Sequence, residues 1–275
     1  MQKRDLFDCL NRGGMACFAL TEPGAGSDAG AVSCRAEKVE GGYILNGTKC
    51  FITNAPIADK ITLFANTREG GGIRGLTVFL VDADTKGISI GKEEDKMGIR
   101  ASATAEIIFE DCFVPDSARV GKEGRGFMIA MQTLQMSRPV VAAISVGIAQ
   151  AAIEAAVAYS HHRKQFGVKI ATFEMVQQMI ADMVMKTEAA RIFTYKACVA
   201  QMNKDKKAGL YSAMSKCFAS DTAMEVTTTA VQVMGGNGYS RENPVEKYMR
   251  DAKIMQIYEG TNQVQRLVIA NETTF

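Results

Sequence analysis

The chain has 275 residues, of which 47% are apolar, and its 32 basic and 30 acidic side chains give a formal net charge of +2. This apolar content can bury one large core or two smaller ones. The charge balance argues against a nucleic-acid surface, because charges of both signs are interspersed and form no basic stripe.

Membrane and metal signals are weak along the whole chain. No segment has the roughly 18 uninterrupted apolar residues of a membrane span, and the N-terminus lacks the apolar core of a signal peptide. The seven cysteines include no CxxC pair and do not cluster with His161 and His162 in a metal-ligand pattern. We therefore expect reduced thiols, no metal site and no membrane span.

The first half of the chain alternates short apolar runs with glycine turns. This pattern predicts strands over residues 43–52, 61–66, 76–81 and 105–113, with Gly70-Gly71-Gly72 as a hairpin tip. The expected structure is an antiparallel barrel or sandwich that forms a domain of residues 1–120.

A glycine-rich turn runs from Ala19 to Asp28. Gly24, Gly26 and Ala29 fit the loose GxGxxG/A pattern, but that fingerprint needs a following helix, and residues 31–39 read as a short strand. A dinucleotide-binding βαβ unit is therefore not expected. Such a turn can still hold a phosphate or pyrophosphate with backbone N–H groups and the Ser27 hydroxyl.

Long helical patterns follow residue 120. They predict helices at about 123–160, 173–203, 207–235 and 244–273, the last with a break at Glu259-Gly260. Thr172 is the expected N-cap of the second helix. The expected fold is α+β, with an up-down four-helix bundle over residues 121–275 after the β domain. One apolar, methionine-containing stripe indicates core packing: Phe173, Val176, Met179, Ile180, Met183, Val184 and Thr187.

The segment from Ile257 to Gln263 carries an isolated carboxylate, Glu259. An aromatic residue and a glycine flank it and apolar residues precede it, so we expect it at the edge of a dry pocket. Burial there would raise its pKa and make it a usable general base. The alternative is a glutamate on a solvated helix start.

Six segments in one order along the chain resemble the acyl-CoA dehydrogenase family of flavoenzymes. They are Ala19-Leu20-Thr21-Glu22-Pro23-Gly24-Ala25-Gly26-Ser27-Asp28, Lys49-Cys50-Phe51-Ile52-Thr53-Asn54, Met97-Gly98-Ile99-Arg100-Ala101-Ser102, Arg163-Lys164-Gln165-Phe166-Gly167, Gln232-Val233-Met234-Gly235-Gly236-Asn237-Gly238, and Ile257-Tyr258-Glu259-Gly260-Thr261-Asn262-Gln263.

The resemblance implies an FAD-dependent acyl-CoA dehydrogenase of fatty-acid β-oxidation, similar to short- and medium-chain members. Glu259 would remove the α-proton of an acyl thioester and the β-hydrogen would leave as hydride to the flavin, giving a 2,3-enoyl-CoA. Electrons would pass to an electron-transfer flavoprotein. Some members carry the base on the helix that contains Met136-Ser137-Arg138. Residues 127–150 contain no Asp or Glu, which leaves Glu259 as the one candidate at the two positions.

The resemblance also implies roles for residues around the flavin and the substrate. Leu20 and Thr21 would contact the pyrimidine edge of the flavin, and Phe51 and Thr53 would lie beside its reactive ring. Thr261 and Gln263 would close the site. Further cofactor contacts would come from Gly26, Ser27 and Gly235. The adenine half of FAD on a neighbouring subunit would be reached by Arg163, Phe166, Gln232 and Gly236. Acyl-CoA would contact Ser27, Arg138, Tyr258 and Gly260.

Two departures from the family pattern stand out. Family members begin with a further helical domain of about a hundred residues, whereas this chain begins at the strand that leads into Ala19. We expect that domain to be lacking, because the sequence is a fragment or because another chain supplies it. Gln135 stands where many relatives have an aspartate near Arg138.

Two other functions compete with the dehydrogenase. One is a non-catalytic truncated subunit or oligomerisation module that retains a relic of a flavin site. The other is an acyl-CoA oxidase, which hands electrons to oxygen. For the dehydrogenase we expect a homo-oligomer, a homotetramer built as a dimer of dimers. The bacterial cytoplasm is the expected location, and the mitochondrial matrix is the alternative.

Overall fold

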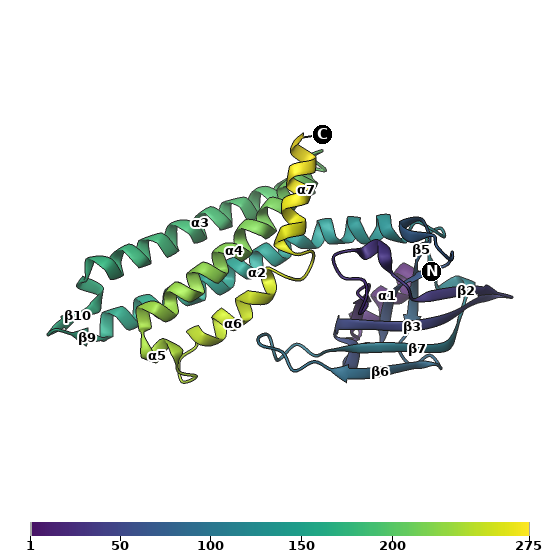
Figure 1. Ribbon diagram of the computed structural model, residues 1–275, viewed down its shortest axis with the longest axis horizontal. Helices are drawn as coiled ribbons and strands as arrows, with labels where there is room; N and C mark the ends of the chain where they lie inside the picture. The colour runs from purple at the N-terminus through teal and green to yellow at the C-terminus, as the bar shows by residue number, and fades with distance from the viewer. Residues whose placement is uncertain (1, 275) are drawn as a thin grey trace. The chain divides into compact units, whose positions relative to one another are not determined.

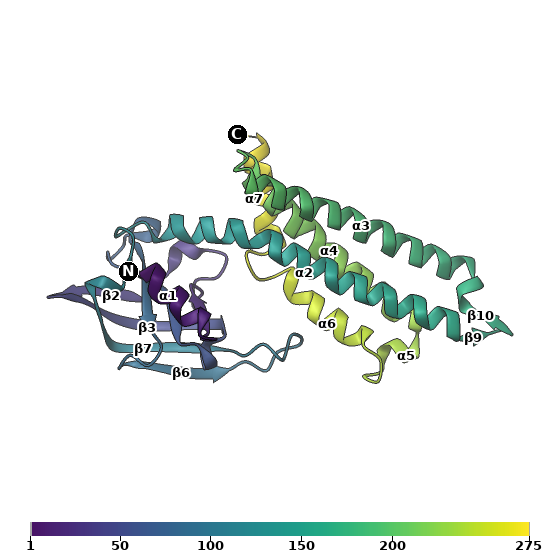
Figure 2. The ribbon, with the colours of Figure 1, turned by 180° about the vertical axis from the view of Figure 1, so that it is seen from behind.

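The computed structural model describes residues 2–274, which form two compact units (Figures 1 and 2). The first unit holds the residues up to 96 together with 100–132. The second holds residues 97–99 and everything from 133 onward. A sheet-rich part followed by a helical part confirms the α+β architecture expected from the sequence.

One eight-stranded sheet forms the first unit. Its strands pair in the order β6-β7-β3-β2-β4-β5-β8, and β1 pairs with β4. Figure 1 shows β2, β3, β7 and β6 side by side in this order. Most neighbours are antiparallel, as expected, but the parallel β1–β4 and β2–β4 pairs make the sheet mixed. The strands are β1 (Ala16–Ala19), β2 (Arg35–Val39), β3 (Gly42–Thr53), β4 (Lys60–Asn66), β5 (Leu76–Asp82), β6 (Ile88–Glu93), β7 (Thr104–Pro115) and β8 (Arg119–Val120).

The core of this unit lies between strands rich in β-branched and aromatic residues. Tyr43, Phe64 and Phe79 are fully buried, and the rings of Tyr43 and Phe79 meet edge to face at 4.9 Å. Each large side chain of this kind contributes about 1.5–3 kcal/mol when it leaves water. The four predicted strands correspond to β3, β4, β5 and β7, whereas β6, with only a partly buried pattern, was not predicted.

A helix precedes the sheet, which the sequence analysis did not anticipate. Helix α1 (Gln2–Asn11) comes before β1, and Asp5 on it forms a 2.8 Å ion pair with Lys60 of β4. Its only buried residue is Cys9, so the helix lacks the continuous apolar stripe that would have revealed it.

The second unit contains most of the helices. Its long helices lie side by side in both ribbon views. A short hairpin joins α2 to α3, and the predicted break near Glu259 is the loop between α6 and α7. The elements are α2 (Gly126–His162, which starts in the first unit), β9 (Lys164–Gln165), β10 (Val168–Lys169), α3 (Glu174–Met202), α4 (Ala208–Met234), α5 (Gly236–Tyr239), α6 (Val245–Met255) and α7 (Asn262–Thr274).

Small residues allow α2 and α4 to pack closely. Ala152 and Ala156 on α2 share a buried cluster with Ala223 and Ala230 on α4 and with Met183 on α3. Among residues 2–274, α2 is the one helix long and apolar enough by composition to cross a membrane. Its buried alanines are instead typical of the core helix of a packed protein.

Two details of α3 differ from expectation. Phe173, not Thr172, occupies the N-cap, and the Thr172 hydroxyl donates to the carbonyl of Lys169 within a preceding 3-10 turn. Met183 and Thr187 of the predicted stripe are buried, but Val184, at the edge of the stripe, is exposed.

The predicted division between residues 120 and 121 lies before α2. By compactness the chain divides within α2, between residues 132 and 133, with residues 97–99 in the helical unit. The domain bounds 1–120 and 121–275 stay a prediction. The end of α2 that belongs to the first unit buries Ala130 in the core of the sheet, with Phe127, Ile129 and Met131 packed against it.

Candidate functional site

In the first unit, the glycine-rich turn is tied to the middle of β3. The carbonyl of Thr21 accepts a hydrogen bond from the Cys50 N–H at 3.0 Å, and the carbonyl of Leu20 accepts one from Lys49 Nζ at 3.1 Å. The structure therefore places Leu20 and Thr21 next to the residue that precedes Phe51. These bonds bring together two of the motifs found in the sequence.

A buried ion pair holds this turn in place. Lys49 Nζ lies 2.7 Å from Glu22 Oε1, and both side chains are almost fully buried. Glu22 also accepts hydrogen bonds from the Ser33 N–H, the Ser33 hydroxyl and the Cys34 N–H at 2.7, 2.7 and 3.0 Å. Burial alone would raise the pKa of Glu22, but the charge of Lys49 and these hydrogen bonds outweigh it and lower the pKa. The pair is not predictable from the sequence, because two charges 27 residues apart leave no local signal.

Phe51 has an unusual conformation for a strand residue. The register of β3 against β7 shifts between Lys49 and Ile52, and Phe51 has a left-handed backbone with φ of +56°. The bulge turns its ring outward, so that it is 64% exposed, and Thr53 two residues later is exposed as well. A bulky residue in this conformation is a genuine outlier that often marks a functional position.

Gly26 and Ser27 are exposed at the far part of the glycine-rich turn. Only a three-residue 3-10 turn (Ala29–Ala31) follows, capped by the Asp28 carboxylate, and the chain then enters β2. The expectation that no dinucleotide-binding helix follows this turn is confirmed.

In the second unit, Glu259 lies in the loop between α6 and α7. Glu259 and Gly260 both have left-handed backbones, with φ of +58° and +88°. The Gln265 amide donates to the carbonyls of Glu259 and Gly260 at 3.2 and 2.9 Å. The Ser137 hydroxyl donates to Glu259 Oε2 at 2.5 Å. Ser137 belongs to the segment that the sequence resemblance implied as the alternative location of the base, so this bond makes the two segments neighbours.

Two cationic side chains surround this loop. Arg138 is 7% exposed, its Nε has no hydrogen-bond partner among the described residues, and burial lowers its pKa while nearby Glu259 acts to raise it. Lys216 on α4 is fully buried, and burial lowers its pKa to about 8 although Cys217, Asp221 and Glu259 act against this shift. Arg138 was predicted from the sequence and Lys216 was not.

Residues on either side of Glu259 shape the ends of the loop. Tyr258 is partly buried, which raises its pKa to about 12, and its hydroxyl donates to the sulfur of Met255. The Thr261 hydroxyl accepts from the Val264 N–H at 3.2 Å and so caps α7. Gln263 is exposed on the first turn of α7.

The other predicted cofactor residues of the second unit lie away from Glu259. Arg163 and Phe166 belong to the β9–β10 hairpin, where Phe166 is 94% exposed with φ of +51°. Gln232, Gly235 and Gly236 lie where α4 ends and α5 begins. A 2.5 Å hydrogen bond from Asn237 on α5 to Tyr159 near the end of α2 joins these two regions. Figure 1 shows the hairpin and α5 at the same end of the bundle.

Residues 97–99 are attached to α6. The Ile99 N–H donates to Asp251 Oδ1 at 2.6 Å, and Arg250 donates to the carbonyl of Met97 at 2.7 Å. A Cβ at Gly98 would lie 2.5 Å from the carbonyl oxygen of Arg250. The glycine of this motif is therefore needed for close contact with the helix backbone.

Surface grooves on the first unit include one of about 540 Å³ beside β2 and β4. None of the predicted site residues lines them. Within residues 2–274, no group of three or more His, Cys, Asp or Glu side chains has the arrangement of a metal site.

Two family models match the chain. Residues 17–112 match the acyl-CoA dehydrogenase middle domain, and residues 124–273 match the acyl-CoA dehydrogenase C-terminal domain. The probable acyl-CoA dehydrogenase FadE25 of Mycobacterium tuberculosis is 50% identical over 270 residues, which cover 98% of this chain and 69% of that protein.

Solved structures give the same result. Butyryl-CoA dehydrogenase from Megasphaera elsdenii is 47% identical with a TM-score of 0.93, over 94% of this chain and 68% of that one. A chain in a structure described as the electron transferring flavoprotein of Acidaminococcus fermentans is 51% identical with a TM-score of 0.92, over the same shares. These matches place the protein among flavoprotein oxidoreductases. The chain belongs to the acyl-CoA dehydrogenase family, as the six sequence segments indicated.

Proposed function

We propose that this chain carries the catalytic parts of an FAD-dependent acyl-CoA dehydrogenase in which Glu259 is the base. The observation that supports this most directly is the setting of its carboxylate. A left-handed loop presents it, Ser137 donates to Oε2, and Arg138 and Lys216 lie close enough for its charge to act on both. A carboxylate held in this way by hydrogen bonds and an unusual backbone is preorganised to take a proton.

The residues of the first unit fit a flat aromatic cofactor. The bulge in β3 exposes the Phe51 ring one residue after Cys50, which is bonded to the Leu20–Thr21 turn, and Thr53 is exposed as well. An exposed aromatic ring held in a strained conformation is suited to stack on or flank a flavin ring. FAD, when bound, supplies the hydride acceptor for the β-hydrogen of the substrate.

The residues of this chain would handle the proton and the thioester. Glu259 would take the α-proton at a carboxylate oxygen, with Ser137 fixing the direction of the carboxylate. The N–H of Glu259 has no acceptor among the described residues, whereas those of Ile257 and Tyr258 donate to the carbonyl of Ile254. A free N–H at this point could donate to the thioester oxygen and stabilise the negative charge that develops there. The product would be a 2,3-enoyl-CoA.

Acyl-CoA would contact Ser27, Arg138, Tyr258 and Gly260. Names among the relatives favour a short acyl chain, since they include butyryl-CoA dehydrogenase and the short-chain specific acyl-CoA dehydrogenase of Mus musculus. Bacterial relatives support the cytoplasm as the location.

The adenine half of FAD would bind at the other end of the bundle, on a different subunit. Lys216 beside the Glu259 loop and Gln232 at the end of α4 are separated by 16 helical residues, or about 24 Å along the helix. This separation supports a homo-oligomer, a dimer of dimers, in which Arg163, Phe166, Gln232 and Gly236 serve a neighbour's cofactor. The similarity to a chain of the Acidaminococcus structure supports electron transfer to an electron-transfer flavoprotein.

An anaerobic titration of the FAD-loaded full chain with butyryl-CoA and octanoyl-CoA tests the proposal. We expect the flavin absorbance to bleach in the wild type and in Glu272→Gln, which removes an exposed carboxylate of α7. Bleaching by Glu259→Gln should be slower by at least about 10²-fold, because a general base typically contributes about 10²–10⁴-fold to the rate.

The outcomes separate the three functions. Equal bleaching of the wild type and Glu259→Gln would overturn the role of Glu259. A chain that binds no flavin would indicate the non-catalytic module, and fast reoxidation of the bleached flavin in air would indicate an oxidase.

A further inference from the structure

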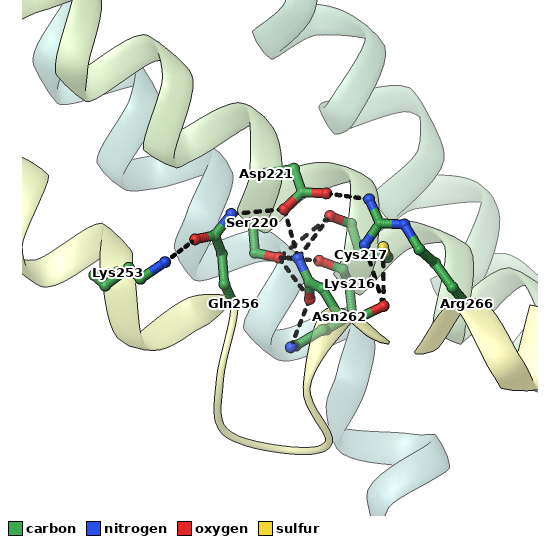
Figure 3. A network of polar contacts seen from close by, with 8 residues as sticks. All are labelled: Lys216, Cys217, Ser220, Asp221, Lys253, Gln256, Asn262 and Arg266. Atoms are coloured by element: carbon green, nitrogen blue, oxygen red, sulfur yellow. Dashed lines mark hydrogen bonds and ion pairs between the residues drawn. The ribbon is translucent and has the colours of Figure 1, made fainter. Parts of the chain in front are cut away.

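A network of polar side chains on α4 faces the loop that carries Glu259 (Figure 3). Its members come from three helices and from the loop itself. They are Lys216, Cys217, Ser220 and Asp221 on α4, Lys253 on α6, Gln256 in the loop, and Asn262 and Arg266 on α7. Most of these contacts hold the two ends of the loop together.

Lys216 is the member that reaches the loop backbone next to Glu259. Its Nζ donates to the carbonyl of Gly260 at 2.9 Å and to Asn262 Oδ1 at 2.9 Å. The side chain is fully buried. Burying an amine that has no hydrogen-bond partner costs free energy. The hydrogen bonds that Lys216 donates to the loop therefore explain how this side chain is accommodated in the core of the bundle.

Asn262 links this contact to the start of α7. Its Nδ2 donates to Asp221 Oδ1 at 2.7 Å and to Ser220 Oγ at 2.9 Å, and its N–H donates to the carbonyl of Gln256 at 3.0 Å. Gln256 in turn donates to Asp221 at 2.6 Å. These hydrogen bonds join the two ends of the loop to each other and to α4, and none of them involves Lys216.

These contacts do not fix the middle of the loop, residues 259–260, where the backbone conformation is energetically unfavourable. A glutamate with a left-handed backbone pays a steric penalty that glycine does not, so residues 259–260 would relax unless external contacts fix them. Among the described residues, the side chains that bond the carbonyls of Glu259 and Gly260 are those of Gln265 and Lys216. Gln265 lies on the same segment as the loop, whereas Lys216 lies on α4.

We propose that Lys216 is a positioning residue, which fixes the left-handed Glu259–Gly260 backbone to α4 and so sets the direction of the Glu259 carboxylate. This inference rests on the proposed role of Glu259 as the base. The groups whose charges act on Lys216 are Cys217 and Asp221 on α4, Arg138 on α2 and Glu259 in the loop. Burial is the main cause of its lowered pKa.

Amide hydrogen exchange of the flavin-free full chain tests the contact without any assay of activity. Lys216→Met keeps the length of the side chain but removes its donors. We expect exchange in the peptide covering residues 256–262 to become at least about tenfold faster, because a lost backbone contact promotes local opening. Lys253→Met is the matched control, since Lys253 is exposed and contacts Gln256 but no carbonyl of residues 259–260. Unchanged exchange in Lys216→Met would overturn the proposal.

The rate of anaerobic flavin bleaching by butyryl-CoA then tests positioning. In Lys216→Met we expect the limiting rate constant to fall by about 10- to 100-fold while the half-saturating butyryl-CoA concentration changes by less than about threefold, because a misdirected base slows proton removal more than it weakens binding. Lys216→Gln, which keeps N–H donors on a shorter side chain, should recover part of the rate. A Lys216→Met protein with faster exchange but a wild-type rate would show a structural contact only and would overturn the proposal.

Two further outcomes distinguish a failure of folding, and a failure of the proposed role of Glu259, from a failure of the Lys216 proposal. If Lys216→Met does not fold, Lys216→Gln is compared in the same two measurements, and failure of both to fold would overturn a positioning role in favour of a folding role. If Glu259→Gln bleaches like the wild type, the proposed function fails while the exchange result still reports on the contact.

Discussion

Three residues predicted to serve the flavin or the substrate share a backbone conformation that side chains normally avoid. Phe51, Phe166 and Glu259 have φ of +56°, +51° and +58°. None is a glycine, asparagine or aspartate, for which this region is tolerated. Such strain persists only when surrounding contacts hold it, and it concentrates at functional positions. The backbone thus supports the choice of these residues independently of the motifs.

The exposed ring of Phe51 gives the first prediction at this scale. Phe51→Ala should leave the free energy of unfolding nearly unchanged, since the ring is largely outside the core. The same change should weaken FAD binding about five- to thirtyfold, as expected for an aromatic contact of about 1–2 kcal/mol. Fluorescence titration with FAD measures it. Phe113→Ala, which removes another half-exposed ring of the sheet, is the control and should bind FAD normally.

The buried Lys216 gives a pH dependence of stability. Its pKa is about 8 in the folded protein and 10.5 in an unperturbed state. Below pH 8 both states are protonated and burial of the charge destabilises the fold. Between pH 8 and pH 10.5 Lys216 is protonated in the unfolded chain but largely neutral in the folded protein, so the free energy of unfolding rises with pH.

Urea unfolding of the wild type and Lys216→Met at several pH values checks this sign. The stability of the wild type relative to the variant should rise by about 2–3 kcal/mol between pH 8 and pH 10 and stay flat below pH 7.5. If the stability of the wild type relative to Lys216→Met falls between pH 8 and pH 10, the lowered pKa of Lys216 is contradicted.

At the scale of elements, helix α6 positions two segments, which are residues 97–99 and the loop that follows the helix. Its Arg250 and Asp251 bind residues 97–99, and the loop after it presents Glu259. Arg250 also pairs with Glu246 one turn earlier, and Lys247 pairs with Asp251, so the polar side of α6 is fixed by contacts along its own length. A short helix of 11 residues is thereby held rigidly.

Gly98→Ala should break the contact between residues 97–99 and α6. The added Cβ would lie 2.5 Å from a backbone carbonyl, and overpacking of this kind costs about 1–3 kcal/mol. Thermal unfolding measures the loss. Gly147→Ala on α2 is the control, because a Cβ there meets nothing within 4 Å and an alanine inside a helix should stabilise by about 0.5–1 kcal/mol. Equal effects of the two changes would exclude the proposed close contact.

At the scale of the whole molecule, the exposed residues of α3 bear on assembly. Met185, Ile192, Tyr195, Val199 and Met202 are more than half exposed, and their spacing of three, four and seven places them on one side of the helix. This exposed apolar face, which includes one charged residue, Glu188, is of the kind that contacts another chain. It supports the predicted homo-oligomer.

Ile192→Glu should therefore reduce the oligomer to smaller species. A carboxylate in the middle of an apolar interface would have to be buried without a partner, which is strongly unfavourable. Light scattering after size-exclusion chromatography measures the mass. Thr228→Glu, at an exposed position on α4, adds the same charge and should leave the mass unchanged. An unchanged mass of Ile192→Glu would argue against this surface.

Features that depend on residues close together in the sequence could be predicted, whereas features that depend on residues far apart in the sequence could not. Strands β3, β4, β5 and β7 and the long helices were predictable because alternation and helical spacing are local consequences of burial. Gly98 and Gly260 were visible as motif residues because a close approach or a positive φ demands glycine. The Glu22–Lys49 pair and the Lys216 contact were not, since each depends on atoms more than 25 residues apart.

By itself, the order of the motifs along the chain determined the family, because each motif records a local backbone requirement such as a turn, a cap or a glycine. Only the tertiary structure decided that Ser137 binds Glu259, that Lys216 reaches the loop backbone and that residues 97–99 join the helical unit. The physical reason is that burial and hydrogen bonding select partners by distance in space, which periodicity and spacing along one chain do not encode.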